Sequence, residues 1–279
     1  MEKFELHAPA FKAPRVGLSG HALLSIACVP IFVFLLGPIL IIVPMSMTSG
    51  EILMFPPDGW SGHAFVDLLR DSQWVASALT SFRVALLATV IAVAAGTGGA
   101  LALHRNDVPA RSFFSTLIML PLLVPVVVLA LADYLFSSTL NLGSNWVSIA
   151  FAHSVVVTPY VFVSVQTSLA GLDPALHRAA RSLGGTTTAL LVDVYWPVIR
   201  TGMVGGAIFA FIGSFDEVVI ALFLSGPNAV TLPVQMFTAL QFDLTPKIAA
   251  VSTVLLAISF VALIVNGYQS LARPKTVPR

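Results

Sequence analysis

The sequence is poor in charged residues and contains a single cysteine. Only 10% of its 279 residues are charged, whereas 57% are apolar, and the mean hydropathy is +0.93. A water-soluble globule of this composition would lack the polar residues needed to cover its surface. Cys28 lies alone in an apolar run, which excludes a disulfide framework and a cysteine-based metal site. The composition therefore predicts a protein embedded in a lipid bilayer, and we predict no metal site.

Motifs for nucleotide binding and for hydrolysis are missing as well. The phosphate-binding pattern G-x-x-x-x-G-K-[ST] does not occur, so this chain is not expected to hold ATP by that route. Neither H-E-x-x-H nor G-x-S-x-G is present. A formal net charge of +1 gives no reason to expect nucleic acid as a partner. We therefore expect neither an enzyme nor a nucleic-acid-binding protein, and no cofactor bound by this chain.

Six apolar stretches are long enough to cross a bilayer, which takes about 20 helical residues. They cover residues 22–44, 75–103, 113–135, 146–169, 203–224 and 248–268. Pro38, Pro121, Pro125 and Pro159 lie inside these stretches and predict kinks or local breaks. Basic residues precede the first stretch, as in a secretory signal, but its length and the lack of an obvious cleavage site favour a retained helix. The predicted fold class is an all-α membrane protein with six transmembrane helices.

The positions of the basic residues predict the orientation of these helices. Eleven of the 14 Lys and Arg residues lie on one side of the predicted membrane: Lys3, Lys12, Arg15, Arg105, Arg111, Arg178, Arg181, Arg200, Arg273, Lys275 and Arg279. By the positive-inside rule that side is cytoplasmic, and so are both termini. We therefore expect a cytoplasmic segment at 1–21, a transmembrane domain at 22–268 and a cytoplasmic tail at 269–279. Residues 45–74, 141–145 and 225–247 are then outside.

The longest predicted cytoplasmic loop, residues 170–202, contains the signals of a short helix. Asp173 can accept hydrogen bonds from the first free backbone N–H groups, and Pro174 suits the first helical position. Gly184 can adopt the left-handed conformation that closes a helix, which predicts an end at Leu183. Ala179 and Ala180 leave part of this helix almost without side chains. Such a surface favours close docking against another protein.

This loop resembles the hallmark cytoplasmic loop of permease subunits of ABC importers, which has Glu-Ala-Ala, three residues, Gly, and a later Pro. The chain matches it with Ala179, Ala180, Gly184 and Pro197. The resemblance implies the type I (MetI-like) permease fold, in which this loop is a coupling helix seated in a cleft of an ATPase subunit. The coupling residues would be Asp173, Arg178, Ala179, Ala180, Leu183, Gly184 and Pro197. The family's Glu is replaced here by Arg178, which reverses a charge on the docking face.

The segments GSFDEVVIALFLSGP (213–227) and TLPVQMF (231–237) extend the resemblance to spermidine/putrescine-type permeases. It implies a bacterial inner membrane location, a second homologous permease, two ATPase subunits that hold ATP and Mg, and an extracytoplasmic solute-binding protein. The implied substrates are polyamines or related small organic cations. Opines, amino-acid derivatives and phosphonates remain alternatives within the same class. An ATP-independent secondary transporter or channel is the competing class, although its inverted repeats are not apparent.

Two acidic residues lie within the fifth apolar stretch. Asp216 and Glu217 fall about 14 residues into it, which places them in the outer third of the bilayer at a rise of about 1.5 Å per residue. Ionised carboxylates at that depth are costly unless they face water, a partner or a ligand. Because adjacent helical residues point about 100° apart, we expect one of them, preferably Asp216, to face the substrate path. A purely structural ion pair, for instance with Arg83, is the alternative.

Further polar and aromatic residues are expected near the same depth. His153 could line the same cavity, but a histidine hydrogen-bonded between helices is the simpler interpretation. Asp133 is most simply a solvated helix end. Phe215, Tyr160 and Trp146 are available for cation–π contact with ammonium groups. The predicted substrate pathway therefore comprises Asp216, Glu217, Phe215, His153 and Tyr160.

Overall fold

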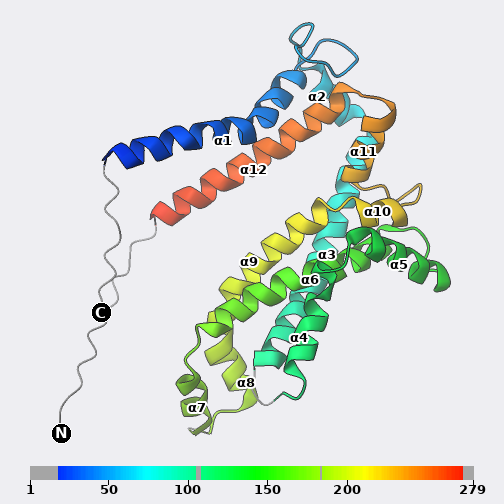
Figure 1. Cartoon of the computed structure of the whole chain (residues 1–279). Helices are drawn as coiled ribbons and strands as arrows, with labels where there is room; N and C mark the ends of the chain where they lie inside the picture. Colours follow the sequence, from blue (N-terminus) through cyan, green and yellow to red (C-terminus); the bar gives the residue numbers. More distant parts are fainter. Residues whose placement is uncertain (1–17, 105–107, 183, 273–279) are drawn as a thin grey trace. The chain divides into compact units, whose positions relative to one another are not determined.

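The computed structural model describes residues 18–104, 108–182 and 184–272, and this part of the chain is almost entirely helical (Figure 1). The helices are α1 (Leu18–Met45), α2 (His63–Arg70), α3 (Ser72–His104), α4 (Arg111–Met119), η1 (Leu120–Leu122), α5 (Val126–Thr139), α6 (Trp146–Ala170), α7 (Pro174–Ser182), α8 (Thr187–Ala189), η2 (Leu190–Tyr195), α9 (Trp196–Phe215), α10 (Val219–Leu224), α11 (Leu232–Phe242) and α12 (Pro246–Ala272). An isolated antiparallel bridge joins Thr48 to Trp60. The chain divides into two units, one of which is Val66–Ile248. The residues up to Phe65 and from Ala249 form the other.

The described residues contain five helices that are long and apolar enough to cross a membrane, and a sixth candidate made of two segments. The five are Ala27–Met45, Ser72–His104, Trp146–Ala170, Thr187–Phe215 and Pro246–Val265. The predicted span at 113–135 is a pair of helical segments, Arg111–Leu122 and Val126–Thr139, that meet at 97°. Pro125 immediately precedes the second segment, so the break predicted there is confirmed. Helices α1 and α6 continue unbroken through Pro38 and Pro159.

The predicted fifth span, 203–224, is wrong in both of its boundaries. The helical run begins much earlier, at Thr187, and it ends at Phe215. Its first part contains the π-helical turn η2, where the N–H of Trp196 bonds to the carbonyl of Leu191. The wider turn accommodates Pro197, which has no N–H and would crowd the carbonyl of a regular preceding turn. Much of the loop predicted at 170–202 is therefore helical, and the acidic pair lies beyond the end of this helix.

Helix α6 is the central element of the Val66–Ile248 unit. It packs along α3 on one side and α9 on the other, and α3 also contacts α9 (Figure 1). A Cβ atom at Gly96 of α3 would lie 2.8 Å from the Cβ of Val161, and one at Gly206 of α9 would lie 2.7 Å from its Cα. Only glycine therefore permits these approaches. In a membrane, where no hydrophobic effect drives helices together, such close contact supplies the van der Waals attraction that holds them.

Shorter helices pack around this core towards the ends of α3 and α6. Helix α10 packs against α5, and α11 packs against α3. The backbone N–H of Leu232, at the start of α11, donates to Ser81 Oγ of α3 at 2.8 Å. Asp71 accepts the N–H of Gln73 at the start of α3 and forms an ion pair of 2.6 Å with Lys247. The hydrogen bond from Lys247 lowers the pKa of Asp71 below its usual value.

We predict that Gly96→Ala destabilises the protein, because the added Cβ would collide with Val161 and with backbone atoms of α6. Overpacking of this kind costs about 1–3 kcal/mol. The matched control is Gly98→Ala, two residues further along the same helix, where nothing lies within 4 Å of the added atom. Thermal unfolding of the purified transporter should show a lower midpoint for Gly96→Ala and an unchanged or higher one for Gly98→Ala. Equal midpoints would contradict the packing described.

Candidate functional site

The short helix α7 has both ends that the sequence predicts. Asp173 Oδ1 accepts the N–H of Ala175 at 2.8 Å, which confirms the predicted start. Gly184 has φ +80°, and the N–H of Gly185 bonds to the carbonyl of Ala180 at 2.9 Å. This is the hydrogen bond of a Schellman motif, which ends the helix after Ser182. Leu183, which was included in the predicted coupling set, lies outside the described residues.

The side chains of α7 that can meet another protein differ from the predicted pair of alanines. Arg178 and Ala179 are exposed, whereas Ala180 is partly buried. Ala180 packs against the core cluster that includes Leu172 and Leu190. Of the two alanines, Ala179 is therefore the more accessible, and Ala180 contributes to the packing of α7. Pro197 is exposed in the first turn of α9 and does not belong to α7.

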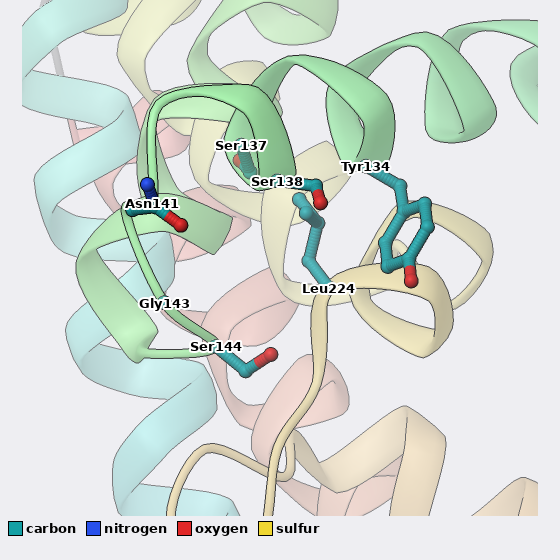
Figure 2. A pocket seen from close by; sticks show the side chains of 7 residues that line it. All are labelled: Tyr134, Ser137, Ser138, Asn141, Gly143, Ser144 and Leu224. Carbon is teal, nitrogen blue, oxygen red and sulfur yellow. The ribbon is translucent and has the colours of Figure 1, made fainter.

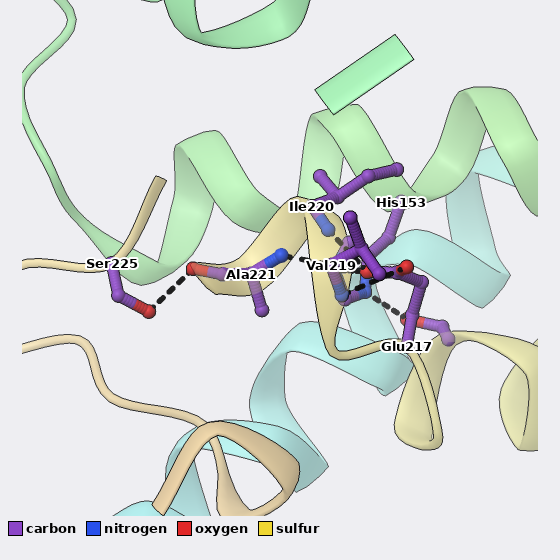
Figure 3. A network of polar contacts seen from close by, with 7 residues as sticks. His153, Glu217, Val219, Ile220, Ala221 and Ser225 are labelled. Atoms are coloured by element: carbon purple, nitrogen blue, oxygen red, sulfur yellow. Dashed lines mark hydrogen bonds and ion pairs between the residues drawn. The ribbon is translucent and has the colours of Figure 1, made fainter. Parts of the chain in front are cut away.

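The acidic residues occupy a break between α9 and α10. Helix α9 ends at Phe215, α10 begins at Val219, and Glu217 lies between them (Figure 3). Its carboxylate accepts backbone N–H groups of α10: Val219 at 3.1 Å, Ile220 at 2.8 Å and Ala221 at 3.4 Å. These are N–H groups of the first turn, which have no partner within the helix. The Glu217 side chain, 11% exposed, is thus a cap for α10.

His153 of α6 is buried beside this break, with 1% of its surface exposed. Its Nδ1 lies 3.0 Å from Ser214 Oγ, in the last turn of α9. Its Nε2 lies 3.6 Å from Glu217 Oε2, which is longer than a hydrogen bond. This nitrogen has no hydrogen-bond partner in the described part of the chain. His153 therefore bridges α6 to both sides of the break.

Asp216 differs from its neighbour in its surroundings. It is exposed, and its backbone N–H bonds to the carbonyl of Ile212 as the C-cap of α9. Arg83 is also exposed, and in the described residues it forms no ion pair with Asp216 or Glu217. The alternative of a structural ion pair with Arg83 therefore has no support. Of the two acidic side chains, Asp216 is the one free to meet a ligand.

Aromatic side chains lie close to Asp216 along α9. Phe215 stacks on Phe211 with ring centroids 6.0 Å apart, and Phe211 meets Phe82 of α3 edge to face at 5.8 Å. Tyr160 of α6 is 39% exposed, and its ring borders Gly213 of α9. Phe215 and Tyr160 therefore approach the break from two helices. Trp146, by contrast, packs against a different cluster near the start of α6.

A polar pocket of about 290 Å³ lies where α5 and α10 end, and sequence reasoning did not predict it (Figure 2). Its walls are Tyr134, Ser137, Ser138, Asn141, Gly143, Ser144 and Leu224. Three of these residues, Asn141, Gly143 and Ser144, belong to the predicted outer turn between α5 and α6, and three others lie on α5. Asp133 is half-buried on α5 and is not among the lining residues.

Ser214 is also part of the site, as the partner of His153, although the sequence analysis did not predict a role for it. It is separated from His153 by 61 residues, and a lone serine in an apolar stretch has no local pattern that distinguishes it. The His153–Ser214 contact depends on how α6 packs against α9. The spacing of apolar residues within α6 or α9 does not predict how the two helices pack.

Comparison with known sequences gives one family over most of the chain. A family model described as "Binding-protein-dependent transport system inner membrane component" matches residues 92–277. The chain is 32% identical over 232 residues to the putrescine transport system permease protein PotI of Escherichia coli strain K12, covering 81% of this chain and 82% of that one. It is 26% identical over 249 residues to the spermidine/putrescine permease protein PotC of the same strain, covering 88% and 92%.

A third relative is named for another substrate. A permease protein named for 2-aminoethylphosphonate transport, PhnV of Salmonella paratyphi A, is 28% identical over 241 residues, covering 85% of this chain and 90% of that one. Among solved structures, a bacterial ABC transporter involved in alginate import matches with a TM-score of 0.65 at 15% identity. That match covers 94% of this chain and all of the other, and at this identity it supports the fold alone.

Proposed function

The chain belongs to the family of binding-protein-dependent transport system inner membrane components, and from this membership we propose that it is a permease subunit of a polyamine importer. It is a non-catalytic subunit of an ABC importer in the inner membrane, and ATP is bound by a partner ATPase. The proposed substrates are polyamines or related small organic cations. One copy would supply half of the pathway, with a second homologous permease, two ATPase subunits and an extracytoplasmic binding protein.

The exposed carboxylate of Asp216 is the observation that carries the cation proposal. It lies at a helix break with no side-chain partner among the described residues, while Glu217 is engaged by α10. Phe215 adjoins it, and an aromatic face beside a carboxylate suits an ammonium group. The relatives named for putrescine and spermidine agree with this chemistry.

The structure supports a mechanical connection from α7 to this carboxylate. A helical run of 29 residues, Thr187–Phe215, begins shortly after α7 and ends directly before Asp216. The π-helical turn η2, at the start of the run, also packs against α7. A displacement of α7 by the ATPase would therefore move one end of a rod whose other end presents Asp216. In this way ATPase closure would change the access of the cation site.

The relative named for 2-aminoethylphosphonate supports a second candidate substrate within the same class of importer. Such a ligand combines an amine with an anionic group, and Asp216 would then receive the amine. The polar pocket at the ends of α5 and α10 bears no charge on its lining side chains. It is proposed as part of the outer surface that meets the binding protein.

We predict that Asp216→Asn lowers putrescine uptake by about tenfold at subsaturating substrate, the effect of losing an interaction with a charged group. The matched control is Asp243→Asn, which removes another exposed carboxylate at the end of α11. Uptake of labelled putrescine by cells that express the whole transporter should fall only in the first variant, with equal amounts of assembled complex. Equal uptake by both variants would remove Asp216 from the path.

We predict different defects for bulky substitutions at the two alanines of α7. Ala179→Trp should reduce the ATPase recovered with the purified permease by about tenfold while the permease remains folded, since Ala179 faces outward. Ala180→Trp should instead lower the thermal unfolding midpoint, because Ala180 packs on the core. Normal ATPase recovery with Ala179→Trp would show that this face does not dock. Because Arg178 replaces the family's Glu, we expect an acidic residue opposite it in the ATPase cleft.

A further inference from the structure

The geometry points to His153 as a positioning residue that sets where Asp216 is presented, acting through Ser214 and Glu217. This inference deepens the proposed function, since it rests on the place of Asp216 in the cation path. It assigns a role to a buried side chain that is not itself in position to meet the substrate. Two contacts of His153 support it: one with Ser214 of α9, and one with Glu217 in the break before α10, which Figure 3 shows beside His153.

The contact with Ser214 fixes the end of α9. Ser214 is 2% exposed, and its Oγ lies 3.0 Å from Nδ1 of the buried imidazole. Gly213 packs tightly at the same level, since an added Cβ would lie 3.3 Å from the ring of Tyr160. The last turn of α9 is therefore held against α6 immediately before the helix ends.

The contact with Glu217 places Nε2 of His153 beside the other side of the break, 3.6 Å from Oε2. A shift of a few tenths of an ångström would bring the 3.6 Å separation between Nε2 and Oε2 within hydrogen-bonding distance. A carboxylate can only accept, so that hydrogen bond requires the hydrogen to be on Nε2 of the histidine. In this neutral tautomer Nδ1 accepts the hydroxyl hydrogen of Ser214. Glu217 is meanwhile tied to α10 by its three backbone N–H groups.

Asp216 lies between these two fixed points. Ser214 precedes it by two residues and Glu217 follows it directly, so its backbone has little freedom while both contacts are made. Its side chain has no partner in the described residues, so the backbone is what sets the place from which this carboxylate projects. Loosening the Glu217 contact would let the break and α10 move relative to α9, and the carboxylate of Asp216 would move with them.

The combination of serine, histidine and glutamate also occurs in hydrolases, but the arrangement here does not suit that chemistry. The Ser214 hydroxyl is 2% exposed and therefore closed to a substrate. The carboxylate of Glu217 is already shared among three backbone N–H groups. These three residues thus have a structural arrangement that connects α6, α9 and the segment before α10.

Thiol labelling of position 216 tests this inference with a readout that overall stability does not set. Asp216→Cys is introduced into a Cys28→Ser background, and right-side-out vesicles containing the whole transporter are treated with a cationic methanethiosulfonate reagent. His153→Gln places an amide N–H near the position of Nε2 and keeps the donor to Glu217. His153→Asn places its amide near Nδ1 and leaves Glu217 without that donor. Ser138→Cys, an exposed position on α5, is the control site.

The labelling rate at position 216 should change by about tenfold with His153→Asn, the effect of losing one interaction with a charged group, and should stay close to wild type with His153→Gln. Labelling at position 138 should be the same in all backgrounds. Equal rates at 216 for the two variants, or parallel changes at 138, would overturn the inference. If His153→Asn does not assemble, Ser214→Ala is the deciding variant. It removes the hydroxyl that holds the imidazole, so the labelling rate at position 216 should also change. An unchanged rate would refute the positioning role of His153.

This outcome is independent of whether Asp216 contacts the cation. Labelling at position 216 reports where the residue lies and requires no transport. If Asp216→Asn leaves putrescine uptake intact while labelling follows His153, the proposed cation role fails and the positioning role stands. If uptake depends on Asp216 and the labelling rate at position 216 does not change with the His153 variants, the cation role stands and the positioning role fails.

Discussion

The break between α9 and α10 depends on the carboxylate of Glu217 receiving backbone N–H groups. A helix interrupted within a bilayer leaves donors that water cannot satisfy, and each one costs several kcal/mol. Glu217 satisfies three of them and at the same time gives its own charge a set of partners. The two costs thus cancel each other locally. The adjacent carboxylate of Asp216 takes no part in this capping and is exposed.

The position of this break relative to the rest of the unit depends on α6. Glycine residues on α3 and α9 bring both helices close to Val161, so α6 is packed from two sides without room to shift. His153, on the same helix, then contacts both Ser214 and Glu217. The helical run from Thr187 to Phe215 lies along α6 and links the region of α7 to the break. The close packing of α3 and α9 around Val161 therefore determines the geometry of the polar contacts that His153 makes further along α6.

Local chemistry predicted several elements correctly because their causes lie within a few residues. Asp173 caps α7, Gly184 ends it with a positive φ, and Pro125 separates two helices, as the sequence indicated. The fifth span was predicted with wrong boundaries because hydropathy does not register a break whose polar groups satisfy one another. Apolar residues continue on both sides of Asp216 and Glu217, so the stretch was interpreted as one helix. The inward packing of Ala180 was missed for a related reason, since alanine suits both a core and a docking surface.

The sequence by itself determined that this chain is a helical membrane protein of the importer permease family, where the short helix α7 begins and where two acidic residues interrupt an apolar stretch. These features follow from composition, from capping residues and from motif spacing, which act along the chain. Tertiary structure alone decided which acidic residue is engaged and which is exposed, and that His153 reaches both Ser214 and Glu217. Such contacts join residues about 60 positions apart. They form only when close packing of α6 and α9 brings these side chains together, and neither helix encodes that packing in its own periodicity.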